Sequence, residues 1–115
     1  MRTLVSEPEG VVTGFVNLGA TRDQEASSVG EHFAMYVLPE EWGQGVGRAL
    51  MLETLKALRD EGFAEAILWV LEDNPRTRCF YELSGWCLDG GVKEEDLLET
   101  RVREVRYRIT LKPAE

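Results

Sequence analysis

Hydrophobic and polar positions alternate along much of the chain, and this pattern predicts six strands. Short apolar or alternating runs place them at residues 3–6, 11–18, 31–37, 66–71, 86–88 and 102–111. The run at 66–71 is almost continuously apolar, which is typical of a strand covered on both faces. The charged and glycine-containing stretch at residues 89–99 is predicted to be a connection between the last two strands.

Two segments have a helical period instead. Over residues 45–61, Met51, Leu55 and Leu58 recur on one face while charged side chains take the other, so an amphipathic helix is predicted. A second helix is predicted over residues 75–83. The order strand, strand, strand, helix, strand, helix, strand, strand favours an α+β fold in which helices flank a mixed sheet.

Composition limits the size and the partners of the protein. With 115 residues, the chain is expected to form a single domain over residues 1–115. The formal charge of −8 argues against nucleic acid or an anionic membrane as the main partner. No apolar run of about 18 residues that could span a membrane is present. No signal peptide is expected, because a strand pattern follows Met1 almost directly, so the cytoplasm is the expected location.

Metal and thiol chemistry have little support in the sequence. Cys79 and Cys87 are expected to pack as small hydrophobic side chains, and together with His32 they form no ligand cluster of the usual spacing. No metal site is therefore expected. A Cys–His nucleophilic pair is disfavoured because neither residue type lies in a recognisable catalytic context.

A glycine-rich segment between a predicted strand and a predicted helix has the composition of an anion-binding site. It reads Trp42-Gly43-Gln44-Gly45-Val46-Gly47-Arg48-Ala49-Leu50. Alternate glycines let the backbone approach a ligand closely, and the start of a helix presents unpaired N–H groups and a positive dipole end. A ligand that carries a diphosphate would suit such a site, while a tight connection without a ligand is the alternative.

Two common phosphate-binding motifs are excluded by the spacing. A P-loop needs Lys and then Ser or Thr after its last glycine, but Arg48 and Ala49 follow Gly47. A dinucleotide-binding fingerprint needs a further glycine where Leu50 stands. The expected ligand is therefore one that carries a diphosphate but is bound by neither of these two motifs.

Three separated segments resemble the GNAT superfamily of N-acetyltransferases, and the resemblance covers essentially the whole chain. The first is the strand, loop and helix start at residues 36–47. The second combines Asn74 with Phe80-Tyr81-Glu82 and Gly85-Trp86, and the third is Glu104-Val105-Arg106-Tyr107. The resemblance implies the family's acyl-CoA N-acyltransferase fold and acetyl-CoA as cosubstrate. It also implies direct acetyl transfer to a primary amine of a small molecule or peptide.

The resemblance also implies which residues hold acetyl-CoA. Amides of the glycine segment would bind the diphosphate, and these belong to Gly43, Gln44, Gly45, Val46, Gly47, Arg48 and Ala49. Backbone groups of Met35, Tyr36 and Val37 would pair with the pantetheine arm as a neighbouring strand does. Asn74 would contact the cofactor or its helix, with capping of that helix as the alternative.

Two residues are candidates for catalysis on the same resemblance. Tyr81 would protonate the departing CoA thiolate, with a core aromatic as the alternative role. Glu31 would take a proton from the amine, often through water, and the alternative is a solvated charge. A strand amide would hold the oxyanion of the tetrahedral intermediate.

The sequence departs from the family pattern at two places. Trp42 stands where the family usually has Arg or Gln, so a side-chain contact to the diphosphate is expected to be missing. The chain also begins at what resembles the family's second strand, without the usual first strand and two helices. This favours an alternative, an acetyl-CoA-binding or interaction module without turnover that another chain completes, and it favours a homodimer.

Overall fold

The computed structural model describes residues 1–23 and 25–111 and contains six strands and two α-helices. Their order confirms the predicted mixed sheet with flanking helices, and the strands are arranged β1-β2-β3-β4-β6-β5. The elements are β1 (Arg2–Ser6), β2 (Gly14–Ala20), β3 (Val29–Val37), α1 (Val46–Asp60), β4 (Glu65–Leu71), α2 (Pro75–Leu83), β5 (Cys87–Leu97) and β6 (Thr100–Thr110). The chain divides into two compact units, Met1–Ala66 with Thr110–Glu115, and Ile67–Ile109. A single domain over the whole chain stays a prediction.

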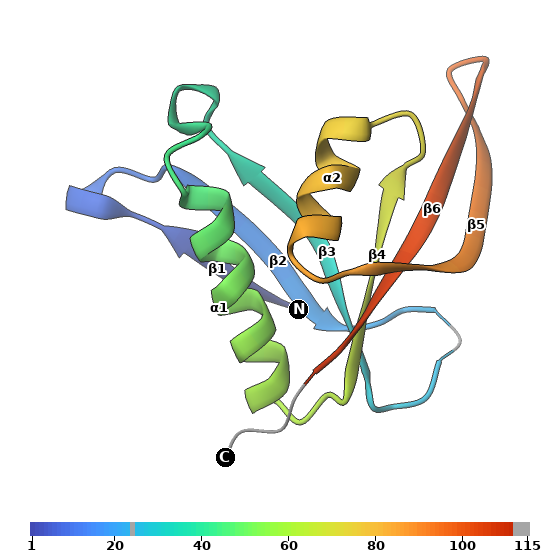
Figure 1. The fold of residues 1–115 in the computed structure, drawn as a ribbon, viewed down its shortest axis with the longest axis horizontal. Helices are drawn as coiled ribbons and strands as arrows, with labels where there is room; N and C mark the ends of the chain where they lie inside the picture. The colour runs from blue at the N-terminus through green and yellow to red at the C-terminus, as the bar shows by residue number, and fades with distance from the viewer. Residues whose placement is uncertain (24, 112–115) are drawn as a thin grey trace. The chain divides into compact units, whose positions relative to one another are not determined.

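In the first unit, β1, β2 and β3 form an antiparallel sheet against which α1 packs (Figure 1). Of the apolar stripe predicted for α1, Met51 and Leu58 are at most 2% exposed, whereas Leu55 is half-buried. Leu50, near the start of the helix, is also buried. Val16 and Leu18 of β2 are fully buried. The unit therefore has its own hydrophobic core between one helix and one sheet face.

The pairing of β2 with β3 shifts by one residue in the middle of the strands. Asn17 lies opposite Ala34, whereas the next residue, Leu18, lies opposite His32, so Phe33 is the extra residue of a β-bulge. His32 is only 2% exposed beside the fully buried Leu18. Burial lowers the pKa of His32 to about 4, so the imidazole is neutral at pH 7.

The buried His32 predicts that the protein loses stability in mild acid. His32 takes up a proton near pH 6.5 in the unfolded state but only near pH 4 in the folded state. The contribution of His32 to the free energy of unfolding is therefore fully present above pH 6.5 and is lost as the pH falls towards 4. The free energy of unfolding should fall by about 2 kcal/mol between pH 8 and pH 5. Urea unfolding of the native chain and of His32→Phe measures it, and an equal pH dependence in both would contradict the assignment. His32 is the only histidine in the sequence, which makes the comparison clean.

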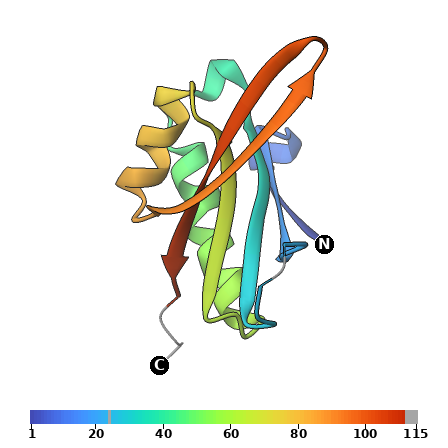
Figure 2. The ribbon, with the colours of Figure 1, turned by 90° about the vertical axis from the view of Figure 1, so that its right-hand side faces the viewer.

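In the second unit, β5 and β6 form one long antiparallel hairpin that closes at Leu98 and Glu99 (Figure 2). The predicted connection at residues 89–99 is therefore wrong, since most of it lies within β5. Only Leu98 and Glu99 form the turn, both with left-handed backbone angles, φ 48° and 66°. The glycines between Leu88 and Val92 form an irregularity in the β5–β6 register instead of a turn.

Ion pairs across the hairpin explain how a charged segment forms a strand. The Arg101 guanidinium lies 2.9 Å from a Glu94 carboxylate oxygen, and Arg103 lies opposite Glu94 in the register. Nearer the start of the hairpin, one carboxylate oxygen of Asp89 accepts hydrogen bonds from both Arg106, at 2.7 Å, and Arg108, at 3.1 Å. Because β5 ends the strand order, charged side chains on it remain in solvent at little cost and discourage pairing with other chains.

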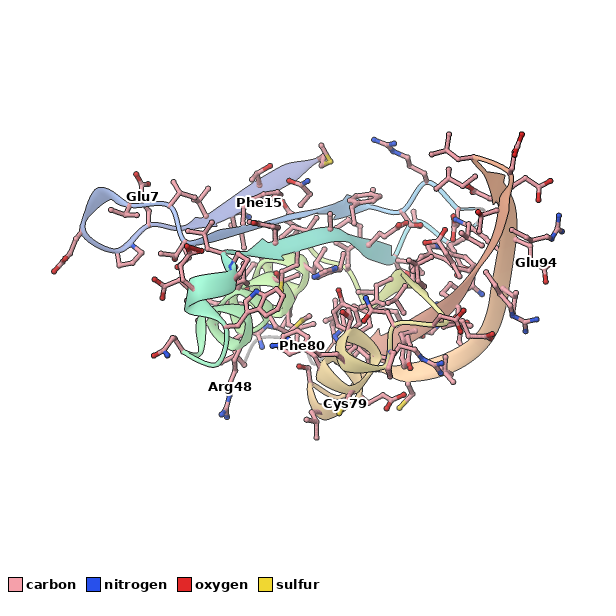
Figure 3. All side chains as sticks on the ribbon, turned by 90° about the horizontal axis from the view of Figure 1, so that it is seen from above. Glu7, Phe15, Arg48, Cys79, Phe80 and Glu94 are labelled. Carbon is pink, nitrogen blue, oxygen red and sulfur yellow. The ribbon has the colours of Figure 1, made fainter. Side chains whose placement is uncertain are left out.

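The two cysteines differ from the expectation of buried side chains. Cys79 and Cys87 are free thiols and both are exposed. Cys79 is carried on α2 (Figure 3), whose only buried residue is Tyr81, and Cys87 begins β5, most of which is exposed.

Candidate functional site

The glycine segment forms an open turn between β3 and α1 in the first unit. A short 3₁₀ helix, Pro39–Glu41, follows β3, and α1 begins at Val46. Gly43 and Gly45 have φ angles of 81° and 86°, in the left-handed region that favours glycine. Apart from each glycine and its two chain neighbours, no heavy atom lies within 4 Å of the position that a Cβ would occupy. The backbone of the turn is therefore accessible to a ligand.

The hydrogen bonds of the turn narrow the set of amides that a ligand could use. The amide of Ala49 donates to the Gly45 carbonyl at 3.0 Å, and the amide of Gln44 donates to Glu41 at 3.2 Å. Both are therefore engaged within the protein, which corrects the expectation that the whole run is available. Residues 46–48 precede the first i→i−4 bond of α1, so their amides have no acceptor within the helix.

Charge around the turn is mixed. Arg48 is exposed and its side chain points outward from the start of α1 (Figure 3), where a cation can meet an anionic ligand. Glu40 and Glu41 precede the turn and oppose that attraction. Backbone amides and the positive end of the α1 dipole must therefore supply much of any anion affinity.

Trp42 fastens the turn to the strand before it. Its indole Nε1 donates a hydrogen bond of 2.9 Å to the backbone carbonyl of Val37, the last residue of β3. A residue that replaces the family's usual Arg or Gln thus has a structural contact within the first unit. The Val37 carbonyl therefore already accepts the hydrogen bond from Trp42. Met35 and Tyr36 lie in the part of β3 that pairs with β2.

Glu31 lies towards the other end of β3 from the glycine turn. Glu31 lies six positions before Val37, which corresponds to at most about 20 Å along a strand. Glu31 is 8% exposed as a residue. Its carboxylate accepts a hydrogen bond of 2.7 Å from the Thr21 hydroxyl, which in turn accepts from the Asp23 amide at 3.1 Å. Glu31 is therefore not a solvated charge at a strand end. It is a held, nearly buried carboxyl group, and no local pattern indicates its partner Thr21.

In the second unit, Asn74 precedes α2 as its N-cap residue, and Tyr81 lies on α2. The Asn74 side chain accepts from the Thr77 amide at 3.2 Å, so it caps the helix, which was the alternative to a cofactor contact. Tyr81 is 7% exposed, and its ring contacts Trp86 and Tyr107 with centroids 6.4 and 6.5 Å away. Burial raises the pKa of the Tyr81 phenol to about 12, so the hydroxyl keeps its proton at neutral pH.

Polar residues beside Tyr81 were not predicted from the sequence. The Tyr107 hydroxyl donates to Glu82 at 2.6 Å and accepts from the Arg78 guanidinium at 3.0 Å. The spacing of Arg78 and Glu82, four residues apart on a helix, indicates a shared face. Nothing in the sequence shows that a tyrosine of β6 meets them there.

Within residues 1–23 and 25–111, no three His, Cys, Asp or Glu side chains gather as ligands for a metal ion. In the same part of the chain, neither helix has the length and apolar character needed to cross a membrane.

Sequence comparison relates this chain to acetyltransferases. The model of the "Acetyltransferase (GNAT) family" matches residues 1–86. An uncharacterized N-acetyltransferase, YuaI of Bacillus subtilis, is 36% identical over 63% of this chain and 42% of its own length. A mycothiol acetyltransferase of Frankia casuarinae is 33% identical over 90% of this chain and 28% of its own. The chain thus spans less than half the length of these two curated relatives.

Solved structures show the same fold. The structure of yncA from Salmonella typhimurium with its cofactor acetyl-CoA superposes with a TM-score of 0.81 at 23% identity, covering 96% of this chain and 64% of that one. The ribosomal-protein-alanine N-acetyltransferase from Brucella melitensis gives a TM-score of 0.82 at 22% identity, over 95% of this chain and 68% of that one. At these identities the likeness concerns the fold.

Proposed function

The chain belongs to the Acetyltransferase (GNAT) family, and on this premise we propose that it transfers an acetyl group from acetyl-CoA directly to a primary amine of a small molecule or peptide. The observation that carries the proposal is the open, left-handed glycine turn at the start of α1. Such a turn suits a diphosphate, and acetyl-CoA carries one. The proposal is supported by the burial of Tyr81, which raises the pKa of its phenol to about 12, and by the hydrogen bond that holds the carboxyl group of Glu31.

In the proposed reaction the amine nitrogen attacks the thioester carbon, forming a C–N bond and a tetrahedral intermediate. A backbone amide of β3 holds the oxyanion, and the C–S bond then breaks. Glu31 accepts the proton that the amine loses, directly or through water, and Tyr81 donates its hydroxyl proton to the departing thiolate. CoA separates its thiol from its diphosphate by a long pantetheine arm, so a base remote from the glycine turn is compatible with this scheme.

The proposal is tested by separating binding from turnover. Calorimetry with CoA measures binding, and release of free thiol from acetyl-CoA in the presence of a panel of primary amines measures transfer. We expect both signals. No binding of CoA by the native chain would reject the proposal, and binding without transfer to any amine would support a binding module instead.

A homodimer in the cytoplasm is the proposed state of the protein. On the sheet of the first unit, Val5 lies opposite Phe15, and Phe15 lies opposite Tyr36 with the two rings stacked 6.0 Å apart. All three are exposed (Phe15 is labelled in Figure 3), and a contiguous apolar row of this kind favours association. Light scattering at micromolar concentration should give twice the monomer mass, and Phe15→Thr should lower it. A strictly monomeric native chain would contradict the proposal.

A further inference from the structure

One hydrogen-bonded group of the second unit joins α2 to β6 through a single buried hydroxyl. Tyr107 of β6 is fully buried, and its hydroxyl both donates to Glu82 at 2.6 Å and accepts from Arg78 at 3.0 Å. Arg78 and Glu82 lie one turn apart on α2, so the hydroxyl bridges two successive turns of the same helix face. A bond of 2.6 Å from a phenol to a carboxylate is a short, charge-assisted hydrogen bond, which is stronger than one between neutral groups.

The same group also fixes the chain before α2. A second nitrogen of the Arg78 guanidinium donates to the backbone carbonyl of Glu72 at 3.1 Å, just beyond the end of β4. The rigid planar fork of arginine makes both of its contacts from one orientation. Residues 72–82 are therefore tied to one point on β6, and α2 can neither rotate nor slide there without breaking a hydrogen bond.

Tyr81 lies within this tied segment. It directly precedes Glu82, its ring contacts the ring of Tyr107 at 6.5 Å, and its backbone carbonyl accepts from the Trp86 amide at 3.1 Å. Trp86 is 1% exposed, and its ring centroid lies 6.4 Å from that of Tyr81. The aromatic packing holds the Tyr81 ring, while the Tyr107 bridge holds the helix that carries it.

We propose that Tyr107, held by Arg78 and Glu82, is a positioning residue for Tyr81 and fixes the Tyr81 hydroxyl where the leaving thiolate needs it. The proposal rests on the proposed function, in which Tyr81 is the proton donor. Tyr107 itself contacts no reacting atom in this scheme. Removing a group that orients a catalytic side chain commonly lowers the reaction rate about 10-fold or more, because small misplacements of that side chain lower the rate steeply.

The variants are chosen so that packing is retained and single hydrogen bonds are removed. Tyr107→Phe keeps the ring beside Tyr81 and removes the bridging hydroxyl. Glu82→Gln keeps an acceptor, whereas Glu82→Met has a similar length and no acceptor oxygen; Glu82 is exposed, so both should fold. Ser84→Ala is the matched control, because it deletes another hydroxyl bond of α2, the 2.9 Å bond to the Phe80 carbonyl, without touching Tyr107.

Turnover with the best amine of the panel should fall about 10-fold in Tyr107→Phe and Glu82→Met, with the affinity for CoA unchanged. Glu82→Gln and Ser84→Ala should stay near the native rate. In a Tyr81→Phe background, Tyr107→Phe should cost nothing further, since it acts through Tyr81. An equal loss in both backgrounds, or no loss in Tyr107→Phe, would overturn the positioning role.

A spectroscopic measurement separates this inference from the proposed function. The sequence has three tyrosines, so the NMR spectrum of ¹³C-labelled tyrosine contains only a few ring signals and each can be followed separately. The Tyr81 signal should shift and broaden in Glu82→Met and remain native in Glu82→Gln and Ser84→Ala. If the native chain transfers no acetyl group, the proposed function fails while this signal still decides the positioning. An unchanged Tyr81 signal in Glu82→Met would overturn the positioning.

Discussion

Tyr81→Phe is expected to lower kcat about 100-fold while the affinity for CoA stays within a few-fold. The change removes only the hydroxyl, which the scheme requires for the departing thiolate. General acids contribute about 10²- to 10⁴-fold, and we expect the lower end for a physical reason. With a pKa of about 12, the phenol is a weak acid beside a thiol, whose ordinary pKa is about 8.5. The phenol donates a hydrogen bond readily, but it transfers its proton to the thiolate only late in the breaking of the C–S bond.

The raised pKa also sets the expected pH dependence. The active form is protonated Tyr81, which is lost only as the pH rises through about 12. Tyr81 should therefore cause no decline in rate up to about pH 10, where an ordinary tyrosine would already be half ionised. Steady-state kinetics from pH 6 to about pH 10 measures this, with thermal unfolding of Tyr81→Phe as the check on folding. Unchanged turnover in a variant that still binds CoA would show that Tyr81 is no general acid.

Gly45→Leu is expected to abolish detectable CoA binding. A side chain at Gly45 would fill space that is empty in the protein and would cover the amides at the start of α1. Hydrogen bonds to charged groups contribute about 1.5–3 kcal/mol each, so the loss of two weakens binding about 100-fold or more. Calorimetry with CoA measures the change.

Gly62→Leu is the matched control for this experiment. Gly62 follows the other end of α1 and has φ 93°, and beyond its chain neighbours no heavy atom lies within 4 Å of the position that a Cβ would occupy. Both substitutions force a leucine into the left-handed region and should each lower stability by about 1–2 kcal/mol. Only Gly45→Leu should lose CoA, because the C-terminal end of a helix does not attract anions. Equal losses of CoA binding in both variants would show that backbone strain causes the loss, and would reject the diphosphate site.

Those elements whose pattern is local were predicted from the sequence. The stripe of α1 needs only the helical period, and the glycine turn needs only backbone freedom next to a helix start, so both were evident from residues close together in the chain. The charged part of β5 was missed because its stabilising partners, such as Arg101 for Glu94, come from another strand. Cys79 and Cys87 were misplaced for a similar reason, since apolar neighbours in sequence do not decide which face a side chain takes.

Residue types and spacing alone thus determined the order of the elements, the family resemblance and the positions of the glycine turn and Tyr81. Only the tertiary structure decided which of the turn's amides are already engaged, that Trp42 bonds to Val37, and that Thr21 holds Glu31. It also decided that Tyr107 meets α2. The physical reason is how far apart in the sequence the interacting residues lie. Secondary structure follows from neighbours along the chain, whereas hydrogen-bond partners, burial and pKa depend on groups that folding brings together.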